Sequence, residues 1–317
     1  MADGPDAPGF TPSGKFQHPD VTRDGAKRAS VPFTGLQTLW VNTGTLCNIE
    51  CAHCYIESSP TNDRLSYLTA AEFAPFLCET EAMGAGEIGF TGGEPFMNPD
   101  IIEMARAALQ KGFAVLILTN AMRPAMRPTM RTGAKALAAE FGGKFSLRVS
   151  LDHFTAAKND EERGEGSFAI ALDGMKALAR DGVQLAVAAR TLWHESEEKT
   201  RAGFAELFAA HGLPIDAADP GELVLFPEMD AARDTPEITT ECWSILGKSP
   251  ADVMCANARM LIKRKGAASP AIVACTLIVD NPEFEMGATL GEAARPVKLN
   301  HPHCSRFCVL GGARCSA

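Results

Sequence analysis

Short apolar runs rich in β-branched residues alternate with longer segments rich in Ala, Leu and Glu along most of the chain. This alternation predicts strands separated by helices. The strands are predicted at residues 36–42, 87–92, 114–120, 145–152, 184–192 and 222–228. The helices are predicted near residues 69–83, 99–111, 132–141, 167–181 and 197–211.

Several predicted helices have recognisable ends. Thr69 is placed as an N-cap with Glu72 three residues later, and the helix that starts near residue 167 stops at Gly182. Six strands alternating with helices indicate a parallel sheet with right-handed connections, either an open doubly wound sheet or part of a barrel. Both architectures gather ligands at the C-terminal ends of the strands, so functional residues are expected there.

The chain divides into three predicted parts. Residues 1–34 are rich in Gly, Pro, Asp and Lys without periodicity, which predicts a flexible or loosely docked arm. Residues 35–239 hold the alternating strands and helices. From residue 240 to 317 the pattern changes, and "ARMLIKRKGAASPAIVACTLIVD" predicts a hairpin around a Gly/Ser/Pro turn. A smaller second domain is predicted there.

Composition limits the classes of function. The 317 residues are 46% hydrophobic and 22% charged, as in an ordinary soluble globular protein. A formal net charge of −9 argues against a nucleic-acid partner held by a general basic surface. The chain has no run of about eighteen apolar residues, and "MADGPDAPGF" lacks the features of a signal peptide, which predicts a cytoplasmic protein without a membrane partner. Ten cysteines in a reducing compartment indicate metal or redox ligands rather than disulfides.

Three of these cysteines, Cys47, Cys51 and Cys54, lie close together in "LCNIECAHCYIE". A structural zinc site usually has four protein ligands, and His53 is too close to Cys54 in the chain for both to reach one small ion. A [4Fe-4S] cluster is normally held by four thiolates, so three thiolates leave one iron without a protein ligand. Such an open position is where a substrate or cofactor binds.

A second motif, "FTGGEPFMNPD", follows the second predicted strand. Gly92 and Gly93 allow the backbone to approach a ligand closely, and Glu94 offers an acceptor to a cation. Taken alone, the motif is equally consistent with a structural turn. Because both motifs directly follow predicted strands, the functional interpretation is favoured.

The segment "CNIECAHC" resembles the CxxxCxxC motif of radical S-adenosylmethionine (SAM) enzymes, and "GGEP" resembles a second motif of that family. The resemblance implies an α/β fold, a partial (β/α)6 TIM-like barrel. It implies that the three cysteines hold a [4Fe-4S] cluster whose open iron binds SAM through its amino and carboxylate groups. It also implies that the GGEP residues contact the SAM ammonium group.

The same resemblance assigns residues at other strand ends. Ser150 and Asp152, which end the fourth predicted strand, are expected at the SAM ribose. Asn120 ends the third strand, and Arg190 lies late in the fifth, where a cation meets the SAM carboxylate through paired hydrogen bonds. For all four residues, ordinary capping of a loop or strand end is the alternative. The resemblance covers roughly residues 36–230.

A second group of cysteines lies near the C-terminus and resembles the Twitch or SPASM extensions of radical SAM enzymes, although its spacing differs from the usual SPASM string. The resemblance implies a small hairpin-containing domain with one auxiliary [4Fe-4S] cluster. The expected ligands are Cys255, Cys275, Cys304 and Cys308, with Cys315 as a fifth candidate. A zinc site aided by His301 and His303 is the alternative. The outlying Cys78 and Cys242 are predicted to pack in the core.

The segment "NAMRPAMRPTMRTGAK" places three arginines at every fourth position, with prolines between them. The prolines predict an extended or turn-rich loop on the active-site face, where the guanidinium groups would clamp a phosphate or carboxylate of the substrate. A solvated basic loop is the alternative. The arginines are Arg123, Arg127 and Arg131.

Acidic residues offer less specific signals. Residues 158–167 are predicted to be solvated surface. Glu195, Glu228 and Asp230 follow strands on the expected active-site face, and each is a candidate acid or base.

The resemblance implies a radical SAM enzyme that makes a 5′-deoxyadenosyl radical and abstracts hydrogen from an unidentified substrate. An auxiliary cluster suggests net oxidation, and the expected electron donor is a flavodoxin- or ferredoxin-type reductant. The substrate is a small molecule or a peptide. The alternatives are a peptide-modifying maturase and a non-catalytic iron–sulfur protein that carries electrons or acts as a sensor.

Overall fold

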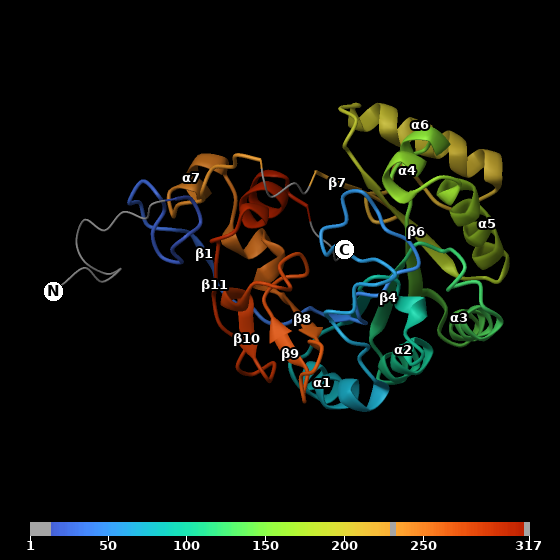
Figure 1. Ribbon diagram of the computed structural model, residues 1–317, viewed down its shortest axis with the longest axis horizontal. Helices are drawn as coiled ribbons and strands as arrows, with labels where there is room; N and C mark the ends of the chain where they lie inside the picture. Colours follow the sequence, from blue (N-terminus) through green and yellow to red (C-terminus); the bar gives the residue numbers. More distant parts are fainter. Residues whose placement is uncertain (1–13, 229–232, 314–317) are drawn as a thin grey trace.

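The computed structural model describes residues 14–228 and 233–313 (Figure 1). Within this part of the chain, one nine-stranded sheet runs in the order β10-β9-β8-β2-β3-β4-β5-β6-β7. The strands from β2 to β7 are parallel neighbours in chain order. They are β2 (Thr38–Asn42), β3 (Glu87–Thr91), β4 (Ala114–Thr119), β5 (Phe145–Ser150), β6 (Gln184–Arg190) and β7 (Leu223–Phe226). All six predicted strands are confirmed.

Helices follow these strands and form the outer layer of the curved sheet (Figure 1). Neighbouring strands in chain order with helices on one side indicate a barrel rather than a doubly wound sheet, so the predicted partial barrel is confirmed. The helices of this layer are α1 (Ala70–Ala82), α2 (Ile101–Gln110), α3 (Pro128–Phe141), α4 (Ala156–Arg163), α5 (Ser167–Arg180) and α6 (Glu197–His211), whereas α7 (Cys242–Leu246) lies apart from it. Single 3-10 turns lie at Pro95–Met97, Gly142–Lys144, Pro250–Asp252, Met254–Ala256 and Pro282–Phe284.

Local sequence explains several of these elements. The Thr69 side chain accepts a hydrogen bond from the Glu72 amide at 3.2 Å, and the Glu72 carboxylate accepts one from the Thr69 amide at 3.1 Å. This reciprocal pair is the predicted capping box. In β3, a Cβ atom at Gly89 would lie 2.6 Å from the Trp40 ring. A glycine is therefore required where this fully buried ring crosses the neighbouring strand.

The C-terminal residues extend the barrel sheet. Strands β8 (Ala258–Ile262) and β9 (Ala271–Val273) are antiparallel, which confirms the predicted hairpin. Strand β8 also pairs in parallel with β2, and β10 (Glu285–Gly287) pairs with β9. A π-helix, Cys304–Leu310, follows and is called here the C-terminal π-helix. The division of the chain at residue 240 stays a prediction.

The segment 14–34 differs from the predicted flexible arm. Strand β1 (Ser30–Val31) pairs with β11 (Val297–Lys298). The Arg28 guanidinium is fully buried, forms an ion pair with Glu237 and donates hydrogen bonds to three backbone carbonyls. The expectation of a loosely docked arm is therefore wrong for these residues, because a buried ion pair holds them against the C-terminal region.

Two segments expected to be irregular are helical. Residues 158–167 were predicted as solvated surface, yet α4 covers most of them and buries Asn159 and Glu162. The basic segment was predicted as a loop, yet α3 begins at Pro128. Proline at the first position of a helix loses no hydrogen bond, so its presence did not exclude a helix starting there.

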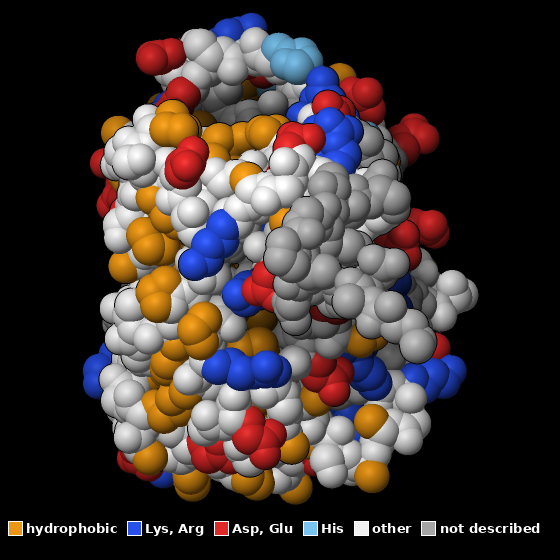
Figure 2. Space-filling model, turned by 90° about the vertical axis from the view of Figure 1, so that its left-hand side faces the viewer, with side chains coloured by type: hydrophobic (Ala, Val, Ile, Leu, Met, Phe, Trp, Pro, Cys, Tyr) orange, Lys and Arg blue, Asp and Glu red, His pale blue; other side chains and the backbone are white. Residues whose placement is uncertain are grey.

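The described residues contain no helix long and apolar enough to span a membrane. Figure 2 shows one face of the molecule, on which Lys and Arg side chains are interspersed with Asp, Glu and hydrophobic side chains. This face carries no broad basic patch of the kind that binds a nucleic-acid backbone.

Replacing Arg28 tests the docking of the N-terminal segment. The Arg28→Met variant leaves the Glu237 carboxylate, whose side chain is 6% exposed, without its charge partner. We expect a loss of about 3–5 kcal/mol in the free energy of unfolding, measured by urea denaturation. Arg23→Met, which changes a half-exposed side chain, is the control and should cost less than about 0.5 kcal/mol. Equal stability of the two variants would contradict the assigned role of Arg28.

Candidate functional site

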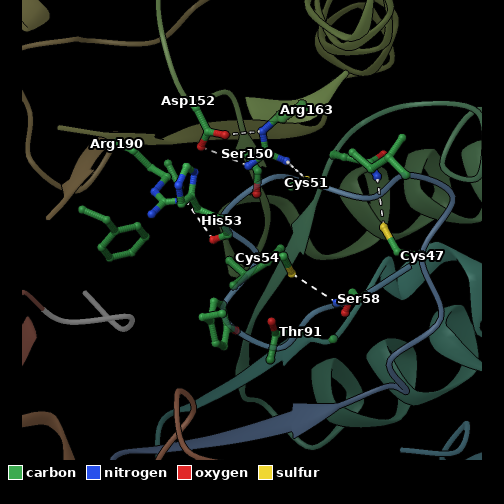
Figure 3. Close-up of a pocket in the computed structure, with 18 of the residues that line it drawn as sticks. Cys47, Cys51, His53, Cys54, Ser58, Thr91, Ser150, Asp152, Arg163 and Arg190 are labelled. Carbon is green, nitrogen blue, oxygen red and sulfur yellow. Dashed lines mark hydrogen bonds and ion pairs between the residues drawn. The ribbon is translucent and has the colours of Figure 1, made fainter. Parts of the chain in front are cut away.

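A cavity lies at the C-terminal ends of the parallel strands (Figure 3). The space at the strand ends, with the open solvent at its mouth included, is about 1070 Å³. Most of the residues predicted from the motifs and strand ends line it together. They are Cys47, Cys51, Cys54, Gly92, Gly93, Asn120, Ser150, Asp152 and Arg190.

The two motif loops are packed against each other through the glycines. A Cβ atom at Gly93 would lie 2.2 Å from the Leu46 carbonyl oxygen, and one at Gly92 would lie 2.5 Å from the Gly44 carbonyl oxygen. The Gly93 amide donates a hydrogen bond to Gly44 at 2.8 Å, and the Glu94 amide donates one to Leu46 at 3.1 Å. No other residue type permits this approach, so the glycines bring the cysteine loop to its place.

Glu94 is buried and does not line the cavity. Its carboxylate accepts hydrogen bonds from the Phe96 amide at 3.1 Å, the Thr119 hydroxyl at 2.9 Å and the Asn120 amide at 2.8 Å. Burial raises its pKa to about 7, although these donors favour the ionised form. Glu94 therefore connects the loop after β3 to the end of β4, and its contact with a ligand cation stays a prediction.

Helix α4 supplies two site residues that the sequence did not indicate. Arg163 forms a two-point ion pair with Asp152, at 2.8 and 3.1 Å, and its Nη1 atom lies 3.9 Å from the Cys51 sulfur. The Glu162 carboxylate lies 2.8 Å from Nδ1 of His53, and the Glu162 carbonyl accepts a hydrogen bond from the Ala52 amide at 2.8 Å. The end of α4 thus contacts the later part of the cysteine loop, whereas the glycine motif contacts its start.

The sequence signals for α4 were weak. Thr155 precedes the helix and Gly164 follows it, which are ordinary start and stop residues. The segment between them is mostly charged, so it lacks the apolar periodicity by which the other helices were predicted.

Arg190 lies beside His53, as both are labelled in Figure 3. Its Nη1 atom donates a hydrogen bond to the His53 carbonyl at 3.0 Å and lies 3.6 Å from Glu162. Its Nε atom is buried and has no hydrogen-bond partner among the described residues. The Ser58 hydroxyl and the Nε atom of Arg163, also at the cavity, are buried without a hydrogen-bond partner in the same part of the structure. Buried polar atoms are rarely left unpaired, so these three indicate a polar ligand in the cavity.

Burial acts against ionisation of Cys47 and Cys51, two members of the first cysteine group. It raises the pKa of Cys47 to about 12 and also raises the pKa of Cys51, for which the Arg163 charge acts in the opposite direction. Thiols in such surroundings stay protonated unless a metal replaces the proton. Three buried or half-buried thiols on one loop, beside a guanidinium, suit a metal cluster better than a reactive free thiolate.

Four cysteines of the second group lie in the described residues. Cys255, Cys275 and Cys304 are buried, and Cys308 is partly buried in the C-terminal π-helix. Burial raises the pKa of Cys304 well above its ordinary value, and the charges of Cys275 and Cys255 raise it further. Cys315 lies outside the described residues.

The zinc alternative involves two neighbouring imidazoles. The rings of His301 and His303 are 4.8 Å apart, and burial lowers the pKa of His301 to about 4. Across residues 14–228 and 233–313, no three or more His, Cys, Asp or Glu side chains are arranged to hold a single metal ion.

The predicted arginine clamp is not assembled at the cavity. Arg127 donates hydrogen bonds to the backbone carbonyls of Phe96 and Pro124, and Arg131 pairs with Asp181 at 2.5 Å. Arg123 is exposed, and none of the three arginines lines the cavity. Two of them therefore have structural partners that the sequence pattern did not reveal.

Two further candidates, Glu195 and Glu228, also lie away from the cavity lining. The Glu195 carboxylate contacts Lys199, Lys158 and His153, and the Lys199 hydrogen bond is the main cause that lowers its pKa to about 2. Glu228 pairs with Arg233. Asp230 lies outside the described residues.

The two outlying cysteines differ from each other. Cys242 is partly buried against the core, as expected. Cys78 is exposed on α1, so the prediction that it is buried is wrong. Only the neighbouring phenylalanines and leucine of that helix turn toward the core.

Comparisons with known proteins agree with this geometry. The family model of the Radical SAM superfamily matches residues 41–205. The antilisterial bacteriocin subtilosin biosynthesis protein AlbA of Bacillus subtilis is 29% identical over 196 residues, which cover 59% of this chain and 41% of AlbA. Mycofactocin maturase MftC of Mycobacterium ulcerans is 32% identical over 136 residues, covering 43% of this chain and 34% of MftC.

A third relative and two solved structures complete the comparison. Fe-coproporphyrin III synthase of Methanosarcina barkeri is 29% identical over 181 residues, covering 54% of this chain and 43% of that protein. These matches span less than half the length of each curated relative. Streptococcus suis SuiB bound to S-adenosylmethionine has a TM-score of 0.59 at 14% identity, covering 80% of this chain and 64% of SuiB. The enzyme anSMEcpe with bound AdoMet has a TM-score of 0.56 at 14% identity, covering 81% and 80%. At such identities the structures show a shared fold.

Replacing Glu162 tests the hold of α4 on the cysteine loop. After anaerobic reconstitution with iron and sulfide, Glu162→Ala should release iron to a chelator about tenfold faster than the unchanged protein, because a charge-assisted hydrogen bond to His53 is lost. Glu161→Ala is the matched control, since Glu161 contacts Trp193 at the surface. Iron release from Glu162→Ala at the unchanged rate would show that α4 does not hold the loop.

Proposed function

We propose that this chain, which belongs to the radical SAM superfamily, is an enzyme that modifies a peptide. The observation that carries the proposal is the convergence at one cavity of three cysteines, two glycines and the polar ends of β4, β5 and β6. An electron carrier has no need of this polar surface around its cluster. The non-catalytic alternative is therefore disfavoured.

The residues at the cavity fit the expected cofactors. Cys47, Cys51 and Cys54 would hold a [4Fe-4S] cluster, and the buried Nε of Arg190 would meet the SAM carboxylate. With SAM bound, such a cluster supplies a 5′-deoxyadenosyl radical that removes a hydrogen atom from the substrate. The chain's own part is to orient SAM and to exclude water from the space beyond it. Asp152 is held for this purpose by its ion pair with Arg163.

The names of the relatives support a peptide substrate. AlbA is a bacteriocin biosynthesis protein, and MftC is a maturase. Similar folds have been solved with peptides bound, as in SuiB with precursor peptide SuiA and anSMEcpe with Cp18Cys peptide. These comparisons favour the maturase alternative over a small-molecule substrate. Because Fe-coproporphyrin III synthase is also similar to this chain, a tetrapyrrole is the second candidate substrate.

An auxiliary [4Fe-4S] cluster is the second part of the proposal. Cys255, Cys275 and Cys304 belong to one buried cluster, and Cys308, one turn after Cys304 on the C-terminal π-helix, packs against it. Four thiolates from these positions would close the coordination of one cluster. Electrons would come from a flavodoxin- or ferredoxin-type reductant, for which dithionite substitutes in the test.

The cleavage of SAM is the direct test of function. The protein is reconstituted anaerobically, mixed with dithionite and SAM, and analysed for 5′-deoxyadenosine by mass spectrometry. We expect product from the unchanged protein and from Cys78→Ala, an exposed cysteine away from the site. Replacing Cys47, Cys51 and Cys54 by Ala should lower product at least about a hundredfold. A cluster visible in the absorption spectrum without any product would contradict the proposed activity.

Iron counting tests the auxiliary cluster separately. Two clusters predict about eight irons per chain, and about four should remain when Cys47, Cys51 and Cys54 are replaced by Ala. Replacing Cys255, Cys275 and Cys304 by Ala should also leave about four irons per chain. Loss of all iron from the first variant would remove the auxiliary cluster from the account.

A further inference from the structure

The cavity is lined by two chemically different sets of side chains. Its charged groups lie on the barrel at Asp152, Arg163 and Arg190. In the described residues, the segment after β9 and the C-terminal π-helix contribute only Leu277 and Phe307, which are both apolar. The C-terminal region thus closes the radical cavity with a hydrocarbon surface.

The charged groups of the barrel face one another or the space assigned to SAM. Asp152 forms an ion pair with Arg163, and Arg190 donates a hydrogen bond to the His53 carbonyl. The Nε atoms of Arg163 and Arg190 are buried without a hydrogen-bond partner among the described residues, and we assign both to SAM. An additional buried charge in this space would have no partner, which is a large energetic cost. The group that reaches the radical must therefore be uncharged.

The apolar side chains are held in fixed positions. Phe307 is 1% exposed and lies between Cys304 and Cys308. Its ring is 5.5 Å from the ring of Phe226, which ends β7 and also lines the cavity. The Leu277 amide donates a hydrogen bond to the Cys275 sulfur at 3.4 Å. The segments that carry the second cysteine group therefore also position the apolar surface.

We propose, building on the peptide-modifying function above, that the substrate side chain attacked in this cavity is aliphatic or aromatic and that Phe226, Leu277 and Phe307 select it. An apolar surface discriminates in favour of matching side chains by about tenfold to two-hundredfold. It gives no hydrogen-bond partner to a carboxylate or an ammonium group. The carboxylates of a tetrapyrrole would meet the same surface, so this substrate class is disfavoured.

The test uses peptides of the form acetyl-Gly-Gly-X-Gly-Gly-amide, in which X is leucine, phenylalanine, aspartate or lysine with deuterium on its carbons. Binding to the reconstituted, SAM-loaded protein is measured by calorimetry without reductant. The leucine and phenylalanine peptides should bind at least about tenfold more tightly than the other two. With dithionite added, deuterium should enter 5′-deoxyadenosine from these two peptides only.

Variants connect this preference to the named residues. Phe307→Ala and Phe226→Ala should each weaken binding of the phenylalanine peptide about tenfold or more, whereas Leu310→Ala, an exposed position on the same π-helix, should not. Phe307 lies between two cysteines, so Phe307→Ala could prevent folding of the C-terminal region. Phe226 belongs to the barrel, and Phe226→Ala tests the preference in that case. Leu277→Arg should reverse the preference in favour of the aspartate peptide.

The outcomes separate this inference from the proposed function. Equal binding of all four peptides, no binding of any, or tighter binding of coproporphyrin III would overturn the assigned substrate class. Unlabelled 5′-deoxyadenosine formed beside bound apolar peptides would overturn it as well, while leaving SAM cleavage intact. A complete lack of 5′-deoxyadenosine sinks the proposed function, and the calorimetric ranking still decides the side-chain preference.

Discussion

The site depends on the close approach of two backbone segments, at Gly93 and Leu46. Strands β2 and β3 are parallel neighbours, so the loops that follow them leave the sheet side by side. Any side chain at Gly93 would collide with the Leu46 carbonyl, one residue before the first cysteine. This contact fixes the start of the cysteine loop relative to the strand ends and the polar groups that lie there.

The opposite end of the cysteine loop is held by α4 rather than by the sheet. Glu162 and Arg163 contact His53 and Cys51, and Arg163 also holds Asp152. One helix end therefore couples the cysteine loop to the end of β5. The C-terminal region completes the enclosure, because β8 extends the sheet beside β2 and the C-terminal π-helix reaches the end of β7 through Phe307 and Phe226. The segments that carry the second cysteine group therefore reach the cavity that the first cysteine group lines.

The parts that could be predicted from the sequence are those governed by local rules. The strands are buried runs rich in β-branched residues, and the α1 capping box consists of Thr69 and Glu72. The cysteine and glycine motifs were found because their spacing is chemically restrictive. The elements that the sequence did not predict depend on tertiary contacts. The charged helix α4 contacts the cysteine loop. The N-terminal segment is docked through the buried Arg28. The pairing of β8 with β2 joins residues more than two hundred positions apart, which no local pattern reveals.

The central claim is that the first cysteine group leaves one iron open for SAM. It is tested most directly by electron paramagnetic resonance on a protein that carries only this cluster, with Cys255, Cys275 and Cys304 replaced by Ala. After reduction with dithionite, the spectrum is recorded without and with SAM. Coordination of SAM to the open iron predicts a clear change in the g-values of the reduced cluster. Identical spectra at saturating SAM would contradict the claim, because a cluster with an occupied fourth position has no site for the ligand.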